Sequence, residues 1–279
     1  MRGPALAVNI ERRAQRGADL GISFTMQMGF ASFVHRTKRS LRRRLAFTRA
    51  SPFGPTIDDT RRAVAAAFLR GDGIEIGALH HPLVVPRAAR VTYVDRMNVA
   101  ELRRQYPELA NEPLVETQIV DDGETLATIG EATQDFVIAN HFIEHCENPL
   151  LTVRNLLRVL KGGGIVFMAV PDKRFTFDVD RPGTTLDHIL RDFSEGPEWS
   201  KRQHYEEWTR LVNKRTDTSE VNAEVQHLID MKYSIHFHVW SATELLELVQ
   251  ALQRIEQFEL ELFLRNGMES LIILRKTTS

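Results

Sequence analysis

The pattern of apolar and polar positions predicts that strands buried on both faces alternate with amphipathic helices from about residue 56 onward. Short apolar runs rich in β-formers predict five strands, at 73–77, 90–94, 115–120, 136–139 and 165–170. Apolar residues at helical spacing predict helices between them, at 57–69, 99–106 and 149–160. Alternation of this kind is typical of an α/β fold around a parallel sheet.

The segment from Asp135 to Asp178 carries the clearest version of this pattern. Asn148 followed by Pro149 is typical of a helix start, with Asn as the cap and Pro in the first turn. The glycines at 162–164 should end that helix, one of them in the left-handed conformation. A strand, a helix and a second strand in this order predict a parallel pair with a right-handed crossover.

Glycine, acidic or amide residues follow the first four predicted strands at their carboxyl ends. They are Gly77, Asp95, the pair Asp121 and Asp122, and Asn140. In a parallel sheet these ends share one edge, and ligands of open α/β sheets bind beyond it. The spacing from Gly77 to Asp95 is close to the ~20 residues that separate a nucleotide-binding turn from the acid that binds ribose hydroxyls.

The segment after the fifth strand overhangs the same edge of the sheet and is expected to bind a second molecule there, called the acceptor below. Residues 172–182 place six charges in eleven positions, a composition that suits a polyhydroxylated or phosphorylated molecule. Residues 184–195 and 205–231 are expected to be helical, and residues 184–235 are interpreted as a polar helical insertion that covers the site. Within the insertion, packing is the favoured role for its aromatic residues.

The last part of the chain is expected to close the sheet. Ser241 and Glu244 form a capping box at the start of a helix. Strands at 258–264 and 270–274 follow, and Asn266–Gly267 between them is a hairpin turn signal. This pair predicts an antiparallel end to the sheet.

The composition is that of one globular domain with elaborations: 279 residues, 43% hydrophobic and 26% charged. The net charge of −1 argues against a dedicated nucleic-acid binder. The one cysteine, Cys146, excludes an internal disulfide and a multi-cysteine metal site. These features fit a reducing compartment, and we expect a cytoplasmic protein.

Residues 1–55 differ from the remainder and are expected to form a basic N-terminal extension, partly disordered. The first fifty residues carry eleven Lys and Arg against two acidic residues, a net charge of +9. The uncharged stretch 20–34 is too short and too polar to be a membrane-spanning helix of ~20 apolar residues, and it lacks the cleavage site of a signal peptide. A helix at 33–47 could lie on an anionic lipid surface, and a start at Met26 or Met28 is a further interpretation.

The block after the fourth strand carries a resemblance to a known family. Residues 142–149 read FIEHCENP, and the turn RVLKGGG follows at 158–164. The block resembles the class I S-adenosylmethionine-dependent methyltransferases of the small-molecule type, and the EIGALxxPL and PDKRFTFD segments resemble a bacterial subgroup of them. The resemblance covers 73–181 and, more loosely, 240–276. It implies a Rossmann-like seven-stranded sheet, mostly parallel with an antiparallel terminal hairpin, with helices on both faces and a helical insertion after strand five.

The resemblance implies a methyltransferase domain over 56–279, with S-adenosyl-L-methionine as its cofactor. The acid after strand two would hold the ribose hydroxyls, and an acid after strand three would bind the adenine amino group. The implied cofactor-binding residues are Glu75 and Gly77 at the methionine part, Asp95 at the ribose, Asp121, Asp122 and Gly123 at the adenine, and Asn140 under the sulfonium.

The sequence departs from the family's E-x-G-x-G-x-G loop, because Leu79 and His81 stand where the second and third glycines would be. Those glycines let the backbone approach a ligand closely. We therefore expect a loop of different shape. A catalytically silent methyltransferase fold that serves as a binding protein is the alternative.

Two other motifs are weaker. His141-x-x-Glu144-His145 spells an inverted zinc-protease signature, but it lies between a buried strand and the helix start at Asn148. It therefore predicts a loop or a single turn, and no metal site is expected. The unit at 73–95 lacks the G-x-G-x-x-G of nicotinamide-binding proteins, so a dinucleotide is disfavoured.

Transfer of a methyl group to a hydroxyl requires a general base, and histidine is the usual one near neutral pH. The candidates are His141, His238 and His236, of which the last two share one face if their segment is extended. We expect O-methylation of a small or glycan-like acceptor, with no nucleic-acid partner. Methylation of a lipid or quinone, with the basic N-terminus in peripheral contact with a membrane, is the alternative. The oligomeric state is left open.

Overall fold

A computed structural model of the chain describes residues 55–278. The predicted basic extension, with its helix at 33–47, lies outside the described part except for Pro55. No helix in the described part is long and apolar enough to cross a membrane.

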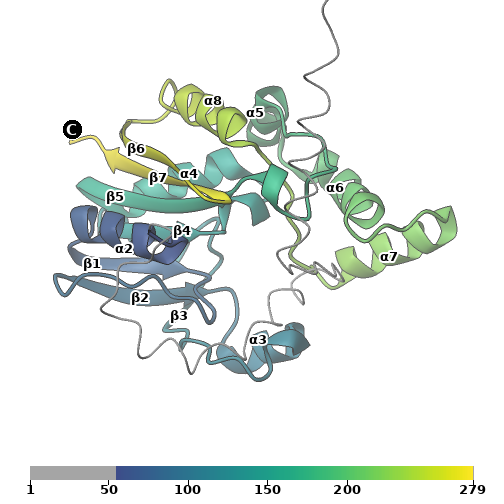
Figure 1. Cartoon of the computed structure of the whole chain (residues 1–279), viewed down its shortest axis with the longest axis horizontal. Helices are drawn as coiled ribbons and strands as arrows, with labels where there is room; N and C mark the ends of the chain where they lie inside the picture. Colours follow the sequence, from purple (N-terminus) through teal and green to yellow (C-terminus); the bar gives the residue numbers. More distant parts are fainter. Residues whose placement is uncertain (1–54, 279) are drawn as a thin grey trace, which may run out of the picture. The chain divides into compact units, whose positions relative to one another are not determined.

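A seven-stranded sheet forms the centre of the fold, in the order β3-β2-β1-β4-β5-β7-β6 (Figure 1). Its strands are β1 Gly71–Ile76, β2 Ala89–Asp95, β3 Ile119–Val120, β4 Gln134–Asn140, β5 Leu160–Pro171, β6 Phe258–Asn266 and β7 Glu269–Lys276. The first five strands are parallel, whereas β7 pairs antiparallel with both β5 and β6. The predicted mostly parallel sheet with an antiparallel terminal hairpin is confirmed.

Helices cover both faces of this sheet. They are α2 Ile57–Phe68, α3 Val99–Gln105, α4 Pro149–Val159, α5 Leu186–Glu195, α6 Glu198–Leu211, α7 Thr218–Asp230 and α8 Ala242–Leu252. Strand β4 explains the two layers, because successive side chains of a strand point to opposite faces. Val137 and Ala139 pack in a core with residues of α4 and α8, whereas Phe136 and Ile138 pack in a second core with Ala65 of α2.

Local signals in the sequence set the predicted helix starts and the hairpin. The side chain of Asn148 accepts a hydrogen bond from the backbone N–H of Leu151, and Pro149 opens α4. Ser241 and Glu244 form the capping box of α8. Gly267 has a φ of 66° in the turn between β6 and β7, a conformation that glycine adopts at no steric cost.

Three predicted boundaries are wrong. Strand β3 has two residues, and the backbone N–H of Val115 instead donates to the carbonyl of Leu79. Helix α4 ends at Val159, and the next residue, Leu160, is extended because β5 begins there. The left-handed glycine, Gly163, therefore lies within β5 and does not end the helix. The helix predicted at 205–231 is two helices, since α6 starts at Glu198 and α7 has its own cap.

The segment expected as an insertion contains α5, α6 and α7, of which α6 and α7 lie to the right of the sheet in Figure 1. It has a hydrophobic core of its own, which includes Tyr205, Trp208, Val221, Val225 and Phe237. Aromatic side chains bury large apolar areas. Tyr205 and Trp208 of α6 therefore pack the insertion, whereas Trp199 at the start of the same helix is exposed.

Candidate functional site

The carboxyl ends of β1 and β4 meet at the point where the strand order reverses. The chain leaves β1 for β2 on one side, and after β3 it crosses to β4 on the other side. Glu75 pairs with Ile138, and Gly77 and Asn140 each lie two residues further along, at the carboxyl ends of these adjacent strands. Open α/β sheets bind ligands in the crevice at such a reversal. The predicted cofactor residues at the ends of these two strands are therefore neighbours.

Gly77 and Asn140 both have features that fit a bound ligand. Gly77 has a φ of 63°, and no heavy atom lies within 4 Å of the place where a β-carbon would be. The side-chain oxygen of Asn140 is buried and has no hydrogen-bond partner among residues 55–278. A buried oxygen without a donor is costly, so a ligand that donates a hydrogen bond here would satisfy it.

Glu75 is engaged inside the protein. Its carboxylate is buried and accepts from the backbone N–H of Leu83, at 2.9 and 3.2 Å from its two oxygens. Burial raises the pKa of Glu75 to about 7. In this structure Glu75 therefore holds the loop 77–83 in place, a role that the sequence did not indicate.

Leu79 keeps a glycine-like backbone although it is not a glycine. Its φ is 49°, in the left-handed region. Its side chain packs against a small core that contains Leu102, Tyr106 and Leu109. A β-carbon in the left-handed conformation is strained, so Leu79 holds a backbone conformation that a glycine would adopt without steric cost.

Replacing Leu79 with glycine is expected to leave the protein more stable than replacing it with alanine, by about 1 kcal/mol. Both changes remove the packing against Leu102, but only glycine removes the β-carbon that opposes a positive φ. Urea denaturation of the two variants beside the wild type measures the difference. Equal stability of the two would mean that the loop does not hold this conformation in solution.

Asp95 ends β2 as predicted and is partly exposed. Its Oδ1 accepts from the backbone N–H of Met97 at 3.3 Å, and burial raises its pKa to about 6. A cavity of about 10 Å³ lies beside it, lined in part by Leu79 and Thr117. That volume suits about one water molecule. A nucleoside at Asp95 would therefore require the loop around Leu79 to move.

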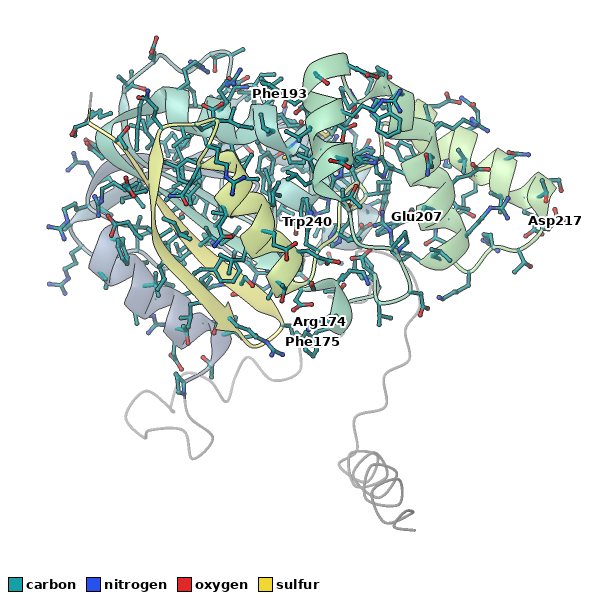
Figure 2. All side chains as sticks on the ribbon, turned by 90° about the horizontal axis from the view of Figure 1, so that it is seen from above. Arg174, Phe175, Phe193, Glu207, Asp217 and Trp240 are labelled. Atoms are coloured by element: carbon teal, nitrogen blue, oxygen red, sulfur yellow. The ribbon has the colours of Figure 1, made fainter. Side chains whose placement is uncertain are left out.

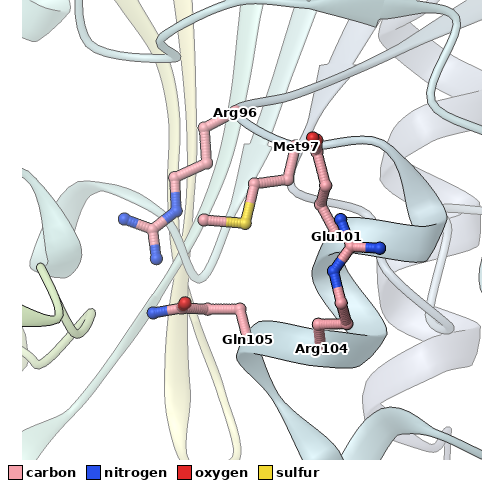
Figure 3. A pocket seen from close by; sticks show the side chains of 5 residues that line it. All are labelled: Arg96, Met97, Glu101, Arg104 and Gln105. Carbon is pink, nitrogen blue, oxygen red and sulfur yellow. The ribbon is translucent and has the colours of Figure 1, made fainter.

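An open groove of about 440 Å³ lies next to Asp95, between the β2–α3 loop and α3. Figure 3 shows its lining side chains, which are Arg96, Met97, Glu101, Arg104 and Gln105. Two of them contact the turn after α7. Arg96 of the β2–α3 loop donates to the carbonyl of Lys232 at 3.2 Å, and Gln105 of α3 donates to the carbonyl of Met231 at 3.1 Å. The insertion thus borders the predicted ribose-binding edge.

The two acids after β3 have different surroundings. Asp121 is buried, and its oxygens accept from the backbone N–H of Asp122 and from the N–H and hydroxyl of Thr128. Burial opposes ionisation of Asp121, but these hydrogen bonds lower its pKa below the usual range. Asp122 is exposed, with Oδ1 accepting from the backbone N–H of Glu124. Of the two, Asp122 is the one that a ligand can reach.

Gly123 lies where no side chain fits. A β-carbon there would come within 2.6 Å of Ile76 and 2.7 Å of Phe142. Contacts under 3.0 Å are essentially never seen for real β-carbons. Gly123 therefore lets the turn after β3 pack onto the end of β1, next to the motif that follows β4.

His141 follows β4 with a φ of 50° and a side chain that is 42% exposed. Its Nε2 lies 3.0 Å from Oε2 of Glu269 and 2.7 Å from a guanidinium nitrogen of Arg61. Arg61 also forms an ion pair with Glu269. Burial alone would raise the pKa of Glu269, but hydrogen bonds from His141 and Arg61 lower it to about 2. His141 is thus held at the strand edge by a carboxylate while part of its ring reaches solvent.

His236 lies deeper, in a cluster with Glu144 and His145. Its Nδ1 is 2.7 Å from Oδ2 of Asp178, and its ring centroid is 4.6 Å from that of His145. Glu144 is buried, and neither of its carboxylate oxygens has a hydrogen-bond partner among the described residues. Burial raises the pKa of Glu144, and the nearest ring nitrogen of His141 is 3.7 Å away. The predicted single turn over 143–145 is confirmed as a 3-10 helix.

His238 is fully buried and belongs to a different cluster from His236. It stacks on Trp240 and lies near His188 and His204. Burial lowers the pKa of His238 well below the usual range and that of His204 to about 4. The segment 234–239 forms no strand, and the two histidines contact different neighbours. Of the three predicted bases, only His141 is accessible to an acceptor in this conformation.

Most charged side chains of the predicted acceptor loop at 172–182 form ion pairs with other residues of the protein. Asp172 pairs with Arg174, Asp178 pairs with Arg181, and Asp180 pairs with Lys214 on the C-terminal side of α6. Two apolar side chains of this loop are exposed, Phe175 and Val179. Figure 2 shows Arg174 and Phe175 beside the end of the β6–β7 hairpin.

Phe175 lies between two cationic groups. The guanidinium carbons of Arg174 and Arg265 are 5.6 and 4.9 Å from its ring centroid. Exposed aromatic rings flanked by cations offer both a stacking surface and hydrogen-bond donors. This edge therefore presents an aromatic platform to solvent beyond β5.

Sequence reasoning missed the partners of His141. Glu269 lies 128 residues further along the chain, and Arg61 lies 80 residues before it. No spacing rule joins such positions. The one available signal was the antiparallel pairing of β7 with β5, which brings the first residue of β7 to the carboxyl end of β5.

The chain matches the model of one protein family, described as a methyltransferase domain, over residues 39–253. A comparison with curated proteins gave no match. Among solved structures it is similar to the PH0226 protein from Pyrococcus horikoshii OT3, at 19% identity and a TM-score of 0.41, covering 75% of this chain and 82% of that one. It is also similar to a SAM-dependent methyltransferase from Aquifex aeolicus, at 12% identity and a TM-score of 0.41, covering 76% and 85%.

A third similar structure is the CurJ carbon methyltransferase, at 9% identity and a TM-score of 0.43. The match covers 80% of this chain but 54% of that one, so the chain spans about half of its length. Sequence identities and TM-scores this low give no information about the substrate. The family match is different, because it spans most of the chain. The chain belongs to the methyltransferase domain family.

Proposed function

We propose that the protein is an S-adenosylmethionine-dependent methyltransferase that transfers a methyl group to an oxygen of a small or glycan-like acceptor. The observation that carries this proposal is the pair at the strand-order reversal. Gly77 leaves open space beside the backbone, and at the end of the adjacent strand the buried oxygen of Asn140 has no partner among the described residues. The side-chain oxygens at this edge, from Asn140, Asp95 and Asp122, are hydrogen-bond acceptors that suit the hydroxyl and amino groups of a nucleoside-containing cofactor.

Each of the proposed cofactor residues has a separate task. Asp95, when ionised, accepts from both hydroxyls of the ribose, because a carboxylate has acceptor capacity for two donors. Asp122 accepts from the adenine amino group, and Asn140 accepts from the amino group of the methionine part. Bound S-adenosylmethionine would supply an electrophilic methyl group.

His141 is the residue that we propose as general base. Its ring is the accessible one, and its Nε2–H can donate to Glu269, which Arg61 holds through an ion pair. A hydroxyl acceptor must lose its proton as the new bond to carbon forms, and the lone pair of Nδ1 of His141 can take that proton. Phe175 and its two flanking arginines suit an acceptor with a sugar ring, because aromatic faces stack on rings and guanidinium groups donate to hydroxyls.

The proposal is tested by calorimetric titration of the purified full-length protein with S-adenosylhomocysteine, with NAD as the control ligand. We expect micromolar binding of S-adenosylhomocysteine and none of NAD. Binding would justify a screen of nucleotide sugars and glycans as acceptors. No binding by a folded protein would favour the silent fold instead, with the narrow space at Leu79 as its physical cause.

Replacing His141 with glutamine is expected to lower kcat by a factor of about 100 to 10,000 with the acceptor that the screen identifies. Glutamine retains polar contacts but cannot accept the proton at neutral pH. The affinity for S-adenosylhomocysteine should stay unchanged. His227→Gln, at an exposed position on α7, is the matched control and should keep the wild-type kcat. A His141→Gln variant with wild-type kcat would remove His141 from the reaction.

A further inference from the structure

A second cluster of polar side chains lies outside the strand-end site, between α5, α6 and the segment before α8. It contains three histidines and one aspartate. His188 and Asp192 are four residues apart on α5, which places them on one face of that helix. His204 comes from α6, and His238 comes from the segment that leads to α8. Ring nitrogens of the three histidines all lie within 4.8 Å of one another.

The distances between these atoms are those of ligands that share one ion. Nε2 of His188 lies 3.1 Å from Nε2 of His204 and 3.3 Å from Oδ2 of Asp192. Nε2 of His238 lies 3.6 Å from the same oxygen. Two ligands of a tetrahedral Zn²⁺ with bonds of about 2.0–2.1 Å are about 3.3 Å apart. These three separations are close to this value, and they place Asp192 next to His188 and His238, and His204 next to His188.

Hydrogen bonds alone leave the aspartate unsatisfied. Asp192 is fully buried, and its Oδ2 has no hydrogen-bond partner among the described residues. No lysine or arginine of the described chain forms an ion pair with it. Its other oxygen accepts from the hydroxyl of Ser200 at 3.2 Å, which aims Oδ2 at the histidines. A buried carboxylate without a cation is unfavourable, and a bound metal ion supplies the missing charge.

His204 and His238 are buried and His188 is partly exposed, and each of the three offers a ring nitrogen to the same point. A metal binds the lone pair of a deprotonated ring nitrogen. The contact from Nε2 of His238 to the carbonyl of Glu147 is 3.4 Å, at the long end of a hydrogen bond, and a metal bond at Nε2 would replace it. The ring proton then lies on Nδ1 of His238, which has no partner within 55–278. One unpaired N–H is a small loss against a full coordination bond.

We propose that His188, Asp192, His204 and His238 bind one divalent transition-metal ion, with Zn²⁺ the best match to imidazole and carboxylate ligands in tetrahedral geometry. Four protein ligands complete the coordination, which is typical of a structural site. The ion ties the first two helices of the insertion to the segment before α8. It therefore fixes the insertion beside the strand-end site without taking part in the reaction. Sequence analysis expected no metal, because these four ligands spread over 51 residues without a known spacing pattern.

The first experiment measures metal content by elemental analysis. The full-length chain is purified without a polyhistidine tag and without chelator. We expect about one zinc ion per chain, a large loss of it in His204→Gln, and full retention in the exposed control His227→Gln. His236→Gln should also retain the ion. Loss in His236→Gln with retention in His204→Gln would place the metal at the Glu144–His145–His236 cluster and would overturn this assignment.

The second experiment uses the wild-type chain, so it does not depend on a variant folding. After metal removal by a chelator, Co²⁺ is added as a spectroscopic probe, followed by Zn²⁺. We expect the visible absorption of tetrahedral Co²⁺, its displacement by Zn²⁺, and a rise in Tm with Zn²⁺, because the ion binds the folded state. A chain purified without zinc that gives no Co²⁺ spectrum and no shift in Tm would overturn the proposal. Neither readout depends on S-adenosylmethionine or on activity.

Discussion

Replacing Asp95 with alanine is expected to weaken the binding of S-adenosylhomocysteine about 30- to 100-fold. The carboxylate lies at the carboxyl end of β2, where it accepts from the backbone N–H of Met97 at 3.3 Å. In the proposed complex, the change would remove two charge-assisted hydrogen bonds to the ribose and leave the ribose hydroxyls without these acceptors. Calorimetric titration of wild type and variant with the same ligand measures the difference.

Two further variants make this test specific. Asp95→Asn keeps the shape and one acceptor oxygen, so its affinity should lie between wild type and Asp95→Ala. Glu259→Ala removes an exposed carboxylate on β6, at the far edge of the sheet, and should bind as the wild type does. Unchanged binding in Asp95→Ala would contradict the assignment of the ribose site.

The same carboxylate predicts a pH dependence. Burial raises the pKa of Asp95 to about 6 in the ligand-free protein. Above that value the carboxylate is ionised and accepts from both hydroxyls. As the pH falls through about 6, the group becomes protonated and the affinity should fall. Titrations at several pH values should therefore show a loss of affinity that Asp95→Ala no longer shows.

Replacing Arg181 with alanine is expected to destabilise the protein by about 3–5 kcal/mol, because the carboxylates of Asp178 and Glu207 lose the guanidinium that they share. Arg181 is buried, and it donates to Asp178 at 2.9 Å and to Glu207 on α6 at 2.7 Å. Figure 2 labels Glu207. Arg181 also donates to the carbonyl of His236 at 2.7 Å. The arginine therefore joins the loop after β5, helix α6 and the segment before α8, and urea denaturation measures its loss.

The control for this prediction is an exposed pair of the same loop. Lys214 pairs with Asp180, and both side chains are more than half exposed. Exposed ion pairs contribute little, so Lys214→Ala should be far less destabilising than Arg181→Ala. Similar effects of both changes would contradict the argument from burial.

Low pH should have a similar effect through Asp178. Burial opposes its ionisation, but hydrogen bonds and charges from His236 and Arg181 lower its pKa below the usual 3.8. A group with a lowered pKa stabilises the folded state above its unfolded pKa and loses that contribution as the pH falls through its folded pKa. The stability difference between the wild type and Arg181→Ala should therefore shrink below about pH 4.

The sequence alone determined the strands, most of the helices and the edge at which the site lies. These features are local. A continuous apolar run defines β4, apolar residues at a period of 3.6 define α4, and Asn148 and Ser241 cap their own helices. Parallel order then brings Gly77, Asp95 and Asn140 to one edge without further information.

Tertiary structure decided everything that depends on contacts between distant segments. The carboxylate of Glu75 points inward and accepts from the backbone of Leu83. The charged side chains of the loop after β5 form ion pairs with other residues. His141 contacts Glu269 because β7 pairs antiparallel with β5. Likewise, His188, His204 and His238 came together only because α5, α6 and the segment before α8 pack around one point. A periodic pattern gives the face on which a residue lies, but the partner on that face is set by the packing of the whole fold.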